Sequence, residues 1–223
     1  MFRRTFARWA DSLERDLDKR APRIVVHGLI LVDRYTNDDV EQSERLLREA
    51  QLAVWMIHEE DPISYRRLVR CVDRITICPL HARGYFYRDR REIKISGSLI
   101  EAGNVSVVAL TLIHELTHAR IAAAGIASMT YEARSREEAV CEKRVRAFVA
   151  RMAQRDPEWI PHRDGRLGMP LPQALPDDAY WRLRHADTVA SLNHLGAPGW
   201  LVRLLSYLAD RRRVKWLRRQ SSG

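Results

Sequence analysis

The chain has 223 residues, which suits one domain with a substantial core, or one core plus a helical appendage. Its 46% apolar and 30% charged residues are typical of a chain that folds, and they do not suggest disorder. The net charge of +9 favours nucleic-acid or anionic-membrane partners. However, only four of the 38 basic residues are Lys, leaving 34 Arg, a skew more typical of a coding bias than of a phosphate-binding face.

The cysteines and the N-terminus indicate the compartment. Cys71, Cys78 and Cys141 form no C-x-x-C pair and no even-numbered framework, which favours a reducing environment. The first residues are basic but lack the apolar core of a signal peptide. No apolar run reaches the roughly 18 residues that would cross a bilayer. We therefore expect a cytoplasmic protein without a transmembrane segment.

Apolar periodicity predicts mixed secondary structure in the first half of the chain. Residues 2–20 are predicted to form an amphipathic helix, and residues 24–32 one short strand. Capping side chains at residues 36–41 begin a helix that stops before Pro62, and residues 63–70 are predicted to add another helical turn or two. Strands are predicted at 74–79, 84–88 and 92–96, the last two joined as a hairpin.

The second half is predicted to be helical, with one long interruption. Helices are expected at residues 105–124 and 135–154, then at 178–195 and 200–217. Five prolines between residues 156 and 178 exclude a long helix there. We expect a core with its N-terminal helix at 1–155, a Pro-rich loop at 156–178, and a C-terminal helical appendage at 179–223 whose basic tail is Arg211–Arg219.

The helix at 105–124 contains the sequence HELTH, which begins at His114. Residues four apart on a helix point the same way within about 40°, so His114 and His118 can share one metal ion. Glu115 projects about 100° from His114, close enough to reach a water on the metal without binding the metal itself. Because this helix is apolar on all sides, we expect it to be buried, where unpaired polar groups would be costly. The pattern predicts a zinc site with Glu115 as its base.

The following helix supplies candidates for a third ligand. When its apolar stripe is centred on Val145, Glu138 falls about 20° from the centre and Glu137 near 80°, at the border. A carboxylate inside a core-facing stripe needs compensation, so Glu138 is the predicted third ligand and Glu137 the alternative. Glu142, one turn later, is predicted to accept the ring N–H of a ligand histidine.

HELTH followed by Glu138 resembles the gluzincin metallopeptidases, and the order of sheet and helices is similar to that of minimal members such as the ImmA/IrrE-type proteases. The resemblance covers roughly residues 75–152. It implies an α+β fold with a zincin-like core, in which a small mixed or antiparallel sheet packs on the HELTH helix and the following ligand helix, with extra helices at both ends. It also implies zinc bound by His114, His118 and Glu138.

By the same resemblance, the function would be hydrolysis of peptide bonds by metal-activated water, with Glu115 as general base. An oxyanion donor is also needed, and the candidates are Tyr131, His162 and His185. The strand at 92–96 would offer its edge to an extended peptide or protein substrate.

Two other functions remain open. One is a zinc-stabilised interaction protein without turnover, whose basic tail, Arg211–Arg219, contacts nucleic acid or an anionic membrane. For that tail a solvated helix end is the simpler interpretation. The other is a SprT-like DNA-associated protease, which would need a third histidine ligand. The next histidine, His162, lies well beyond the following helix.

Overall fold

The computed structural model describes residues 19–36, 39–126, 130–156, 177–194, 196–204, 206, 207 and 211. Its centre is a five-stranded mixed sheet with the strand order β1-β2-β3-β5-β4. The strands span Arg23–Val26 (β1), Leu29–Asp33 (β2), Arg74–Cys78 (β3), Gly84–Tyr87 (β4) and Glu92–Ser96 (β5). The outer pairs β1–β2 and β5–β4 are antiparallel, whereas β2–β3 and β3–β5 are parallel. The expected α+β class with a small mixed sheet is therefore confirmed.

The prediction of a single strand at residues 24–32 is wrong, because the chain turns back within this segment. His27 and Gly28 have φ values of 50° and 87°, and they join β1 to β2 as a tight hairpin. Two successive residues with positive φ match the right-handed twist of the paired strands. Such two-residue turns are usually recognised by Asn-Gly, Asp-Gly or Gly-Gly, and a His-Gly pair inside an apolar run did not signal the turn.

The hairpin predicted next to the HELTH helix is confirmed, but its order in the sheet is not the expected one. A single 3-10 turn, η1 (Arg88–Arg90), links β4 to β5. We expected the strand at 92–96 to offer a free edge. β5 is instead flanked by β3 and β4, and β4 ends the sheet. Strand order depends on pairings between distant segments, which the local pattern does not contain.

One face of the sheet carries the core. Ile75, Ile77, Ile93 and Ile95 have no exposed surface, and they form one apolar cluster with helices α2 (Val40–Glu60), α3 (Pro62–Cys71) and α5 (Val105–Ala123). α2 begins where predicted, since Asp39 caps it by accepting a hydrogen bond from the Gln42 backbone N–H. The short helix α4 (Gly97–Glu101) connects β5 to α5.

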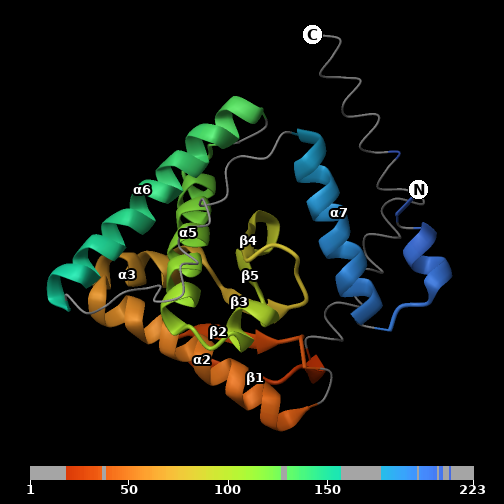
Figure 1. Ribbon diagram of the computed structural model, residues 1–223, viewed down its shortest axis with the longest axis horizontal. Coiled ribbons are helices and arrows are strands. Elements are labelled where there is room, and N and C mark those ends of the chain that lie inside the picture. The colour runs from red at the N-terminus through yellow and green to blue at the C-terminus, as the bar shows by residue number, and fades with distance from the viewer. Residues whose placement is uncertain are drawn as a thin grey trace.

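α5 runs through the middle of the molecule and packs against α6 (Tyr131–Arg155), which follows it as the second arm of a helical hairpin (Figure 1). α6 starts four residues earlier than expected, because the Thr130 side chain caps it by accepting from the Ala133 backbone N–H. By length and composition, α5 is the one helix in the described ranges that could cross a membrane. However, 67% of its apolar window is buried inside the protein, as in a core helix.

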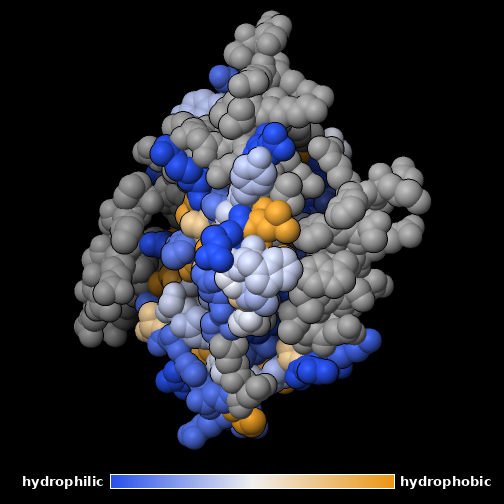
Figure 2. All heavy atoms as spheres, turned by 90° about the vertical axis from the view of Figure 1, so that its right-hand side faces the viewer, coloured by the Kyte–Doolittle hydropathy of each residue, from blue (hydrophilic) through white to orange (hydrophobic). Residues whose placement is uncertain are grey.

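The helix α7 (Asp177–His194) lies on the opposite side of the molecule from α6 (Figure 1). Asp187, 2% exposed, accepts a hydrogen bond from the His81 backbone N–H at 2.7 Å, and Ser191 Oγ lies 3.4 Å from the Pro79 carbonyl oxygen. On this side of the molecule the described surface is mostly hydrophilic, with a small apolar group near its centre (Figure 2).

Some sequence predictions fall outside the described residues. They are nearly all of the N-terminal helix, most of the Pro-rich loop with His162, and the basic tail beyond Arg211.

Candidate metal centre

The two histidines of HELTH project from α5, a helix that is largely buried. His114 is 6% exposed and Glu115 is 5% exposed, and the neighbouring Thr111 and Thr117 turn their hydroxyls back to backbone carbonyls four residues earlier. The hydroxyls are thereby satisfied within the helix, and the imidazoles are the polar groups left to face α6. The expectation that this helix is buried is confirmed.

The structure brings together the three residues predicted as metal ligands. His114 Nε2 and His118 Nε2 lie 3.1 Å apart. The Glu138 carboxylate closes the triangle, with Oε2 at 3.2 Å from His114 Nε2 and Oε1 at 3.5 Å from His118 Nε2. The residue in the middle of the predicted stripe of α6 therefore faces both imidazoles across the helical hairpin.

These distances fit a tetrahedral ion. Zinc–nitrogen and zinc–oxygen bonds of about 2.0–2.1 Å place neighbouring ligand atoms about 3.3 Å apart at the corners of a tetrahedron. The separation of 3.1 Å between the nitrogens, and those of 3.2 Å to Glu138 Oε2 and 3.5 Å to Glu138 Oε1, are each close to that value. Buried Glu138 Oε2 has no hydrogen-bond partner among the described residues, although it faces a ring nitrogen. A cation at the centre of the triangle would satisfy that oxygen and both Nε2 atoms, so these residues fit a metal of the zinc type.

Glu137 contacts His118 at Nδ1, the ring nitrogen that does not face Glu138. Its Oε1 lies 2.8 Å from His118 Nδ1, and both side chains are mostly buried, at 14% and 19% exposure respectively. This contact fixes the ring and leaves Nε2 directed at Glu138 and His114, as a carboxylate behind a ligand histidine does.

Glu142 was expected in that role, and the structure does not place it there. Its Oε1 pairs with Arg146 on the exposed side of α6, and 37% of its side chain is accessible. A helix advances about 100° per residue, so Glu137 and Glu142 differ by about 140° in direction. Both cannot face α5, and the crossing of the two helices selects Glu137.

Cys141 is a further donor at the site, and the sequence pattern did not identify it as a ligand. The Sγ of this wholly buried residue and the donor atoms of His114 and His118 all lie within 4.8 Å of one another. The signal was its position three residues after Glu138, which puts both on one face of α6. Its place on an apolar stripe hid that signal, because buried cysteines are commonly packing residues.

Glu115 lies under the edge strand. Its carboxylate accepts a hydrogen bond from the Phe86 backbone N–H in β4. A Cβ on Gly84 would lie 3.5 Å from Glu115 Cγ, 3.1 Å from Thr111 Cγ2 and only 2.9 Å from the Lys94 carbonyl oxygen. Glycine thus allows β4 to approach the HELTH helix closely, and Glu115 and the edge of the sheet form one wall of the site.

The charges of the cluster favour a cation. Burial raises the pKa of Glu115, an effect that the nearby His118 and His114 oppose. For His118, burial lowers the pKa, but hydrogen bonds with Cys141 and Glu137 and the field of Glu115 outweigh it, leaving the pKa well above its ordinary value. Carboxylates therefore outweigh positive charge around the two rings, which is the environment a divalent ion requires.

The candidate oxyanion donors are not brought to this cluster in the described part of the chain. Tyr131 is 44% exposed in the first turn of α6. His185 lies on α7, and its buried Nε2 has no hydrogen-bond partner among the described residues. His162 lies outside the described residues.

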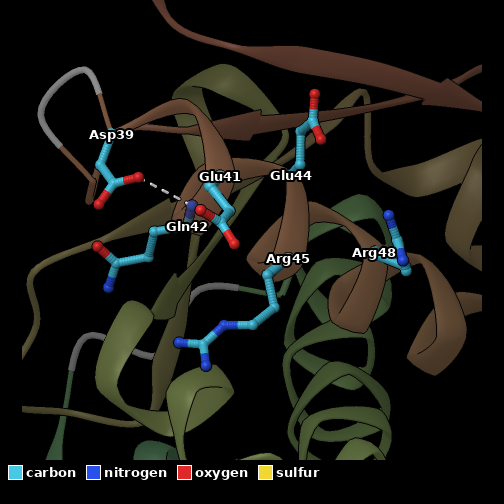
Figure 3. A pocket seen from close by; sticks show the side chains of 6 residues that line it. All are labelled: Asp39, Glu41, Gln42, Glu44, Arg45 and Arg48. Atoms are coloured by element: carbon cyan, nitrogen blue, oxygen red, sulfur yellow. Dashed lines mark hydrogen bonds between the residues drawn. The ribbon is translucent and has the colours of Figure 1, made fainter.

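The structure also contains a polar hollow of about 440 Å³ beside the start of α2 (Figure 3). The side chains that line it are Asp39, Glu41, Gln42, Glu44, Arg45 and Arg48. They belong to the capping turn and the first exposed turns of that helix, and they mix acids with bases. We assign the hollow no part in the metal centre.

No family model, curated protein or solved structure matches this chain. The candidate function therefore depends on the geometry of the cluster and on the HELTH motif.

Proposed function

We propose that the protein is a zinc-dependent peptidase with a zincin-like core, in which His114, His118 and Glu138 hold the metal. The observation that carries this proposal is that the two Nε2 atoms lie 3.1 Å apart on one helix and the Glu138 carboxylate of the next helix faces both, with Oε2 at 3.2 Å from His114 and Oε1 at 3.5 Å from His118. Glu115 stands beside the triangle without taking part in it, as the base of an H-E-x-x-H site would.

The chemistry assigned to the chain's own residues is proton transfer. A bound metal of this type polarises the scissile carbonyl and makes water a better nucleophile. Glu115 takes the proton of the attacking water and gives it to the leaving amine. The Phe86 N–H, which donates to the Glu115 carboxylate, holds the base in place. Glu137 orients the His118 ring through Nδ1.

β4 is the strand that we propose for substrate binding. It ends the sheet, it is antiparallel to β5, and it lies against the HELTH helix beside Glu115. An extended peptide added to this edge would form backbone hydrogen bonds with β4 and would run past the metal. The substrate is thus expected to be an unfolded or extended segment of a peptide or protein.

A reducing compartment such as the cytoplasm suits this enzyme. All three cysteines are free thiols, and Cys78 and Cys141 are buried. A metal site next to a free thiol remains intact only where that thiol is not oxidised.

The test combines metal analysis with hydrolysis by the full chain. We expect about one zinc per chain in the wild type, loss of zinc in Glu138→Ala, and retention of zinc without hydrolysis in Glu115→Gln. The peptide substrates would be a library of unstructured sequences. Absence of metal from the folded wild type would refute the proposal. Hydrolysis by Glu115→Gln at the wild-type rate would refute the role of the base.

A further inference from the structure

Cys141 lies at the metal centre without a role in the proposed hydrolysis. It has no exposed surface, and its Sγ lies within 4.8 Å of the donor nitrogens of both His114 and His118. It also shares a hydrogen bond with His118. Since Glu137, Glu138 and Cys141 fall on the side of α6 that faces α5, all three belong to the shell around the two rings.

The stereochemistry leaves a vacant corner for sulfur. The two imidazole Nε2 atoms, 3.1 Å apart, and the Glu138 carboxylate, which faces one of them with Oε2 and the other with Oε1, would supply three ligands of a tetrahedral ion. With zinc–sulfur and zinc–nitrogen bonds of about 2.3 and 2.05 Å, a sulfur at the fourth corner lies about 3.6 Å from each nitrogen. Cys141 Sγ already lies within 4.8 Å of a ring nitrogen of each histidine, so the sulfur is near the position that a fourth ligand would take.

We propose that Cys141 is a fourth protein ligand, which closes the metal centre as a two-histidine, glutamate and cysteine site when no substrate is bound. This inference depends on the proposed metal site. It adds the coordination of the metal in the enzyme without substrate. On metal binding the thiol proton passes to solvent, and the sulfur binds as thiolate. Water reaches the fourth position only when the sulfur leaves it, so the resting enzyme is closed to hydrolysis.

The closed site also sets the choice of metal. A thiolate prefers zinc and other thiophilic ions, whereas carboxylate and water suit magnesium, calcium and manganese. The cluster without its sulfur would discriminate less between zinc and manganese. Cys141 therefore determines metal selectivity as well as coordination number.

Two spectroscopic measurements on the full chain test this assignment. X-ray absorption of the zinc-loaded wild type should show one sulfur at about 2.3 Å from the metal. The cobalt-substituted wild type should show a sulfur-to-cobalt charge-transfer band. Cys141→Ser should lose both signals, while Cys78→Ser, a second buried cysteine variant, should keep both. Because the X-ray measurement on the wild type needs no variant, the test stands even if Cys141→Ser fails to fold.

The metal competition gives a second readout. We expect Cys141→Ser to lose at least about 100-fold in zinc affinity, a loss beyond that of outer contacts, and to lose less in manganese affinity. Wild type that binds zinc with nitrogen and oxygen ligands only would overturn this inference and leave the proposed function intact. Folded wild type that binds no metal would overturn both.

Discussion

His118 Nδ1 lies 2.8 Å from Glu137 Oε1, so the histidine that ends the HELTH motif is held from behind by the first residue of a consecutive pair of glutamates. The second of the pair, Glu138, faces the other nitrogen of the same ring at 3.5 Å. One imidazole thus joins two carboxylates that follow each other in the sequence. This arrangement assigns different functions to the two acids, and the difference can be measured.

Removal of Glu137 should weaken metal binding without abolishing it. Glu137→Ala takes away the acceptor that fixes the His118 ring, and we expect zinc affinity to fall about 10- to 100-fold. Titration with a competing chelator would measure it. Glu142→Ala is the matched control, because that carboxylate pairs with Arg146, and its zinc affinity should be unchanged. The sequence alone predicted the reverse order for these two variants. That order, if measured, would contradict the helix packing described here.

Gly84→Ala should destabilise the protein and disturb the site together. The new Cβ would meet the Lys94 carbonyl oxygen of β5 at 2.9 Å and Thr111 Cγ2 of α5 at 3.1 Å, so β4 must move away from both elements. We expect a loss of roughly 1–3 kcal/mol in the free energy of unfolding, measured by urea denaturation, as for other overpacked positions. Gly199→Ala, where a Cβ meets nothing within 4 Å, should cost nothing. Equal stability of the two variants would disprove the close approach of β4.

Asp187 should hold α7 in place by accepting a hydrogen bond, and its negative charge should contribute little. Asp187→Ala leaves the His81 backbone N–H without its protein acceptor, and we expect a loss of roughly 0.5–1.5 kcal/mol and faster proteolysis within α7. Asp187→Asn keeps a carbonyl oxygen at the same place and should retain most of the stability. If the two variants lose stability equally, the charge of Asp187 matters and the hydrogen bond does not.

Cys78 should make the protein less stable at alkaline pH. Burial raises the pKa of its thiol to about 12, against 9.0 for the free group. Between those values the unfolded chain has lost the proton and the folded chain keeps it, so stability falls as pH rises, by up to about 1.4 kcal/mol per pH unit. Urea denaturation at pH 8 and pH 10.5 would measure the loss. In Cys78→Ala this part of the pH dependence should vanish. An identical pH dependence in both proteins would count against the buried thiol.

The sequence by itself determined the parts of the protein that depend on local periodicity and capping. The bounds of α2, the β4–β5 hairpin, the buried character of α5 and the phase of His114, Glu115 and His118 all follow from residues within a few turns of one another. Because the helical repeat is fixed, residues four apart share a face wherever the helix is placed. Glu138, from the next helix, was correctly expected to face the histidines, because it lies in the middle of its apolar stripe.

Only the tertiary structure decided which neighbours of Glu138 join the site. Helix phase gives directions around one axis, but the angle and offset at which α6 crosses α5 determine that Glu137 and Cys141 approach His118 while Glu142 turns to solvent. The order of strands likewise depends on pairings between segments far apart in the chain, and it put β4 rather than β5 at the edge beside Glu115. Local patterns contain no information on such packing, because the energy that selects it comes from contacts between elements.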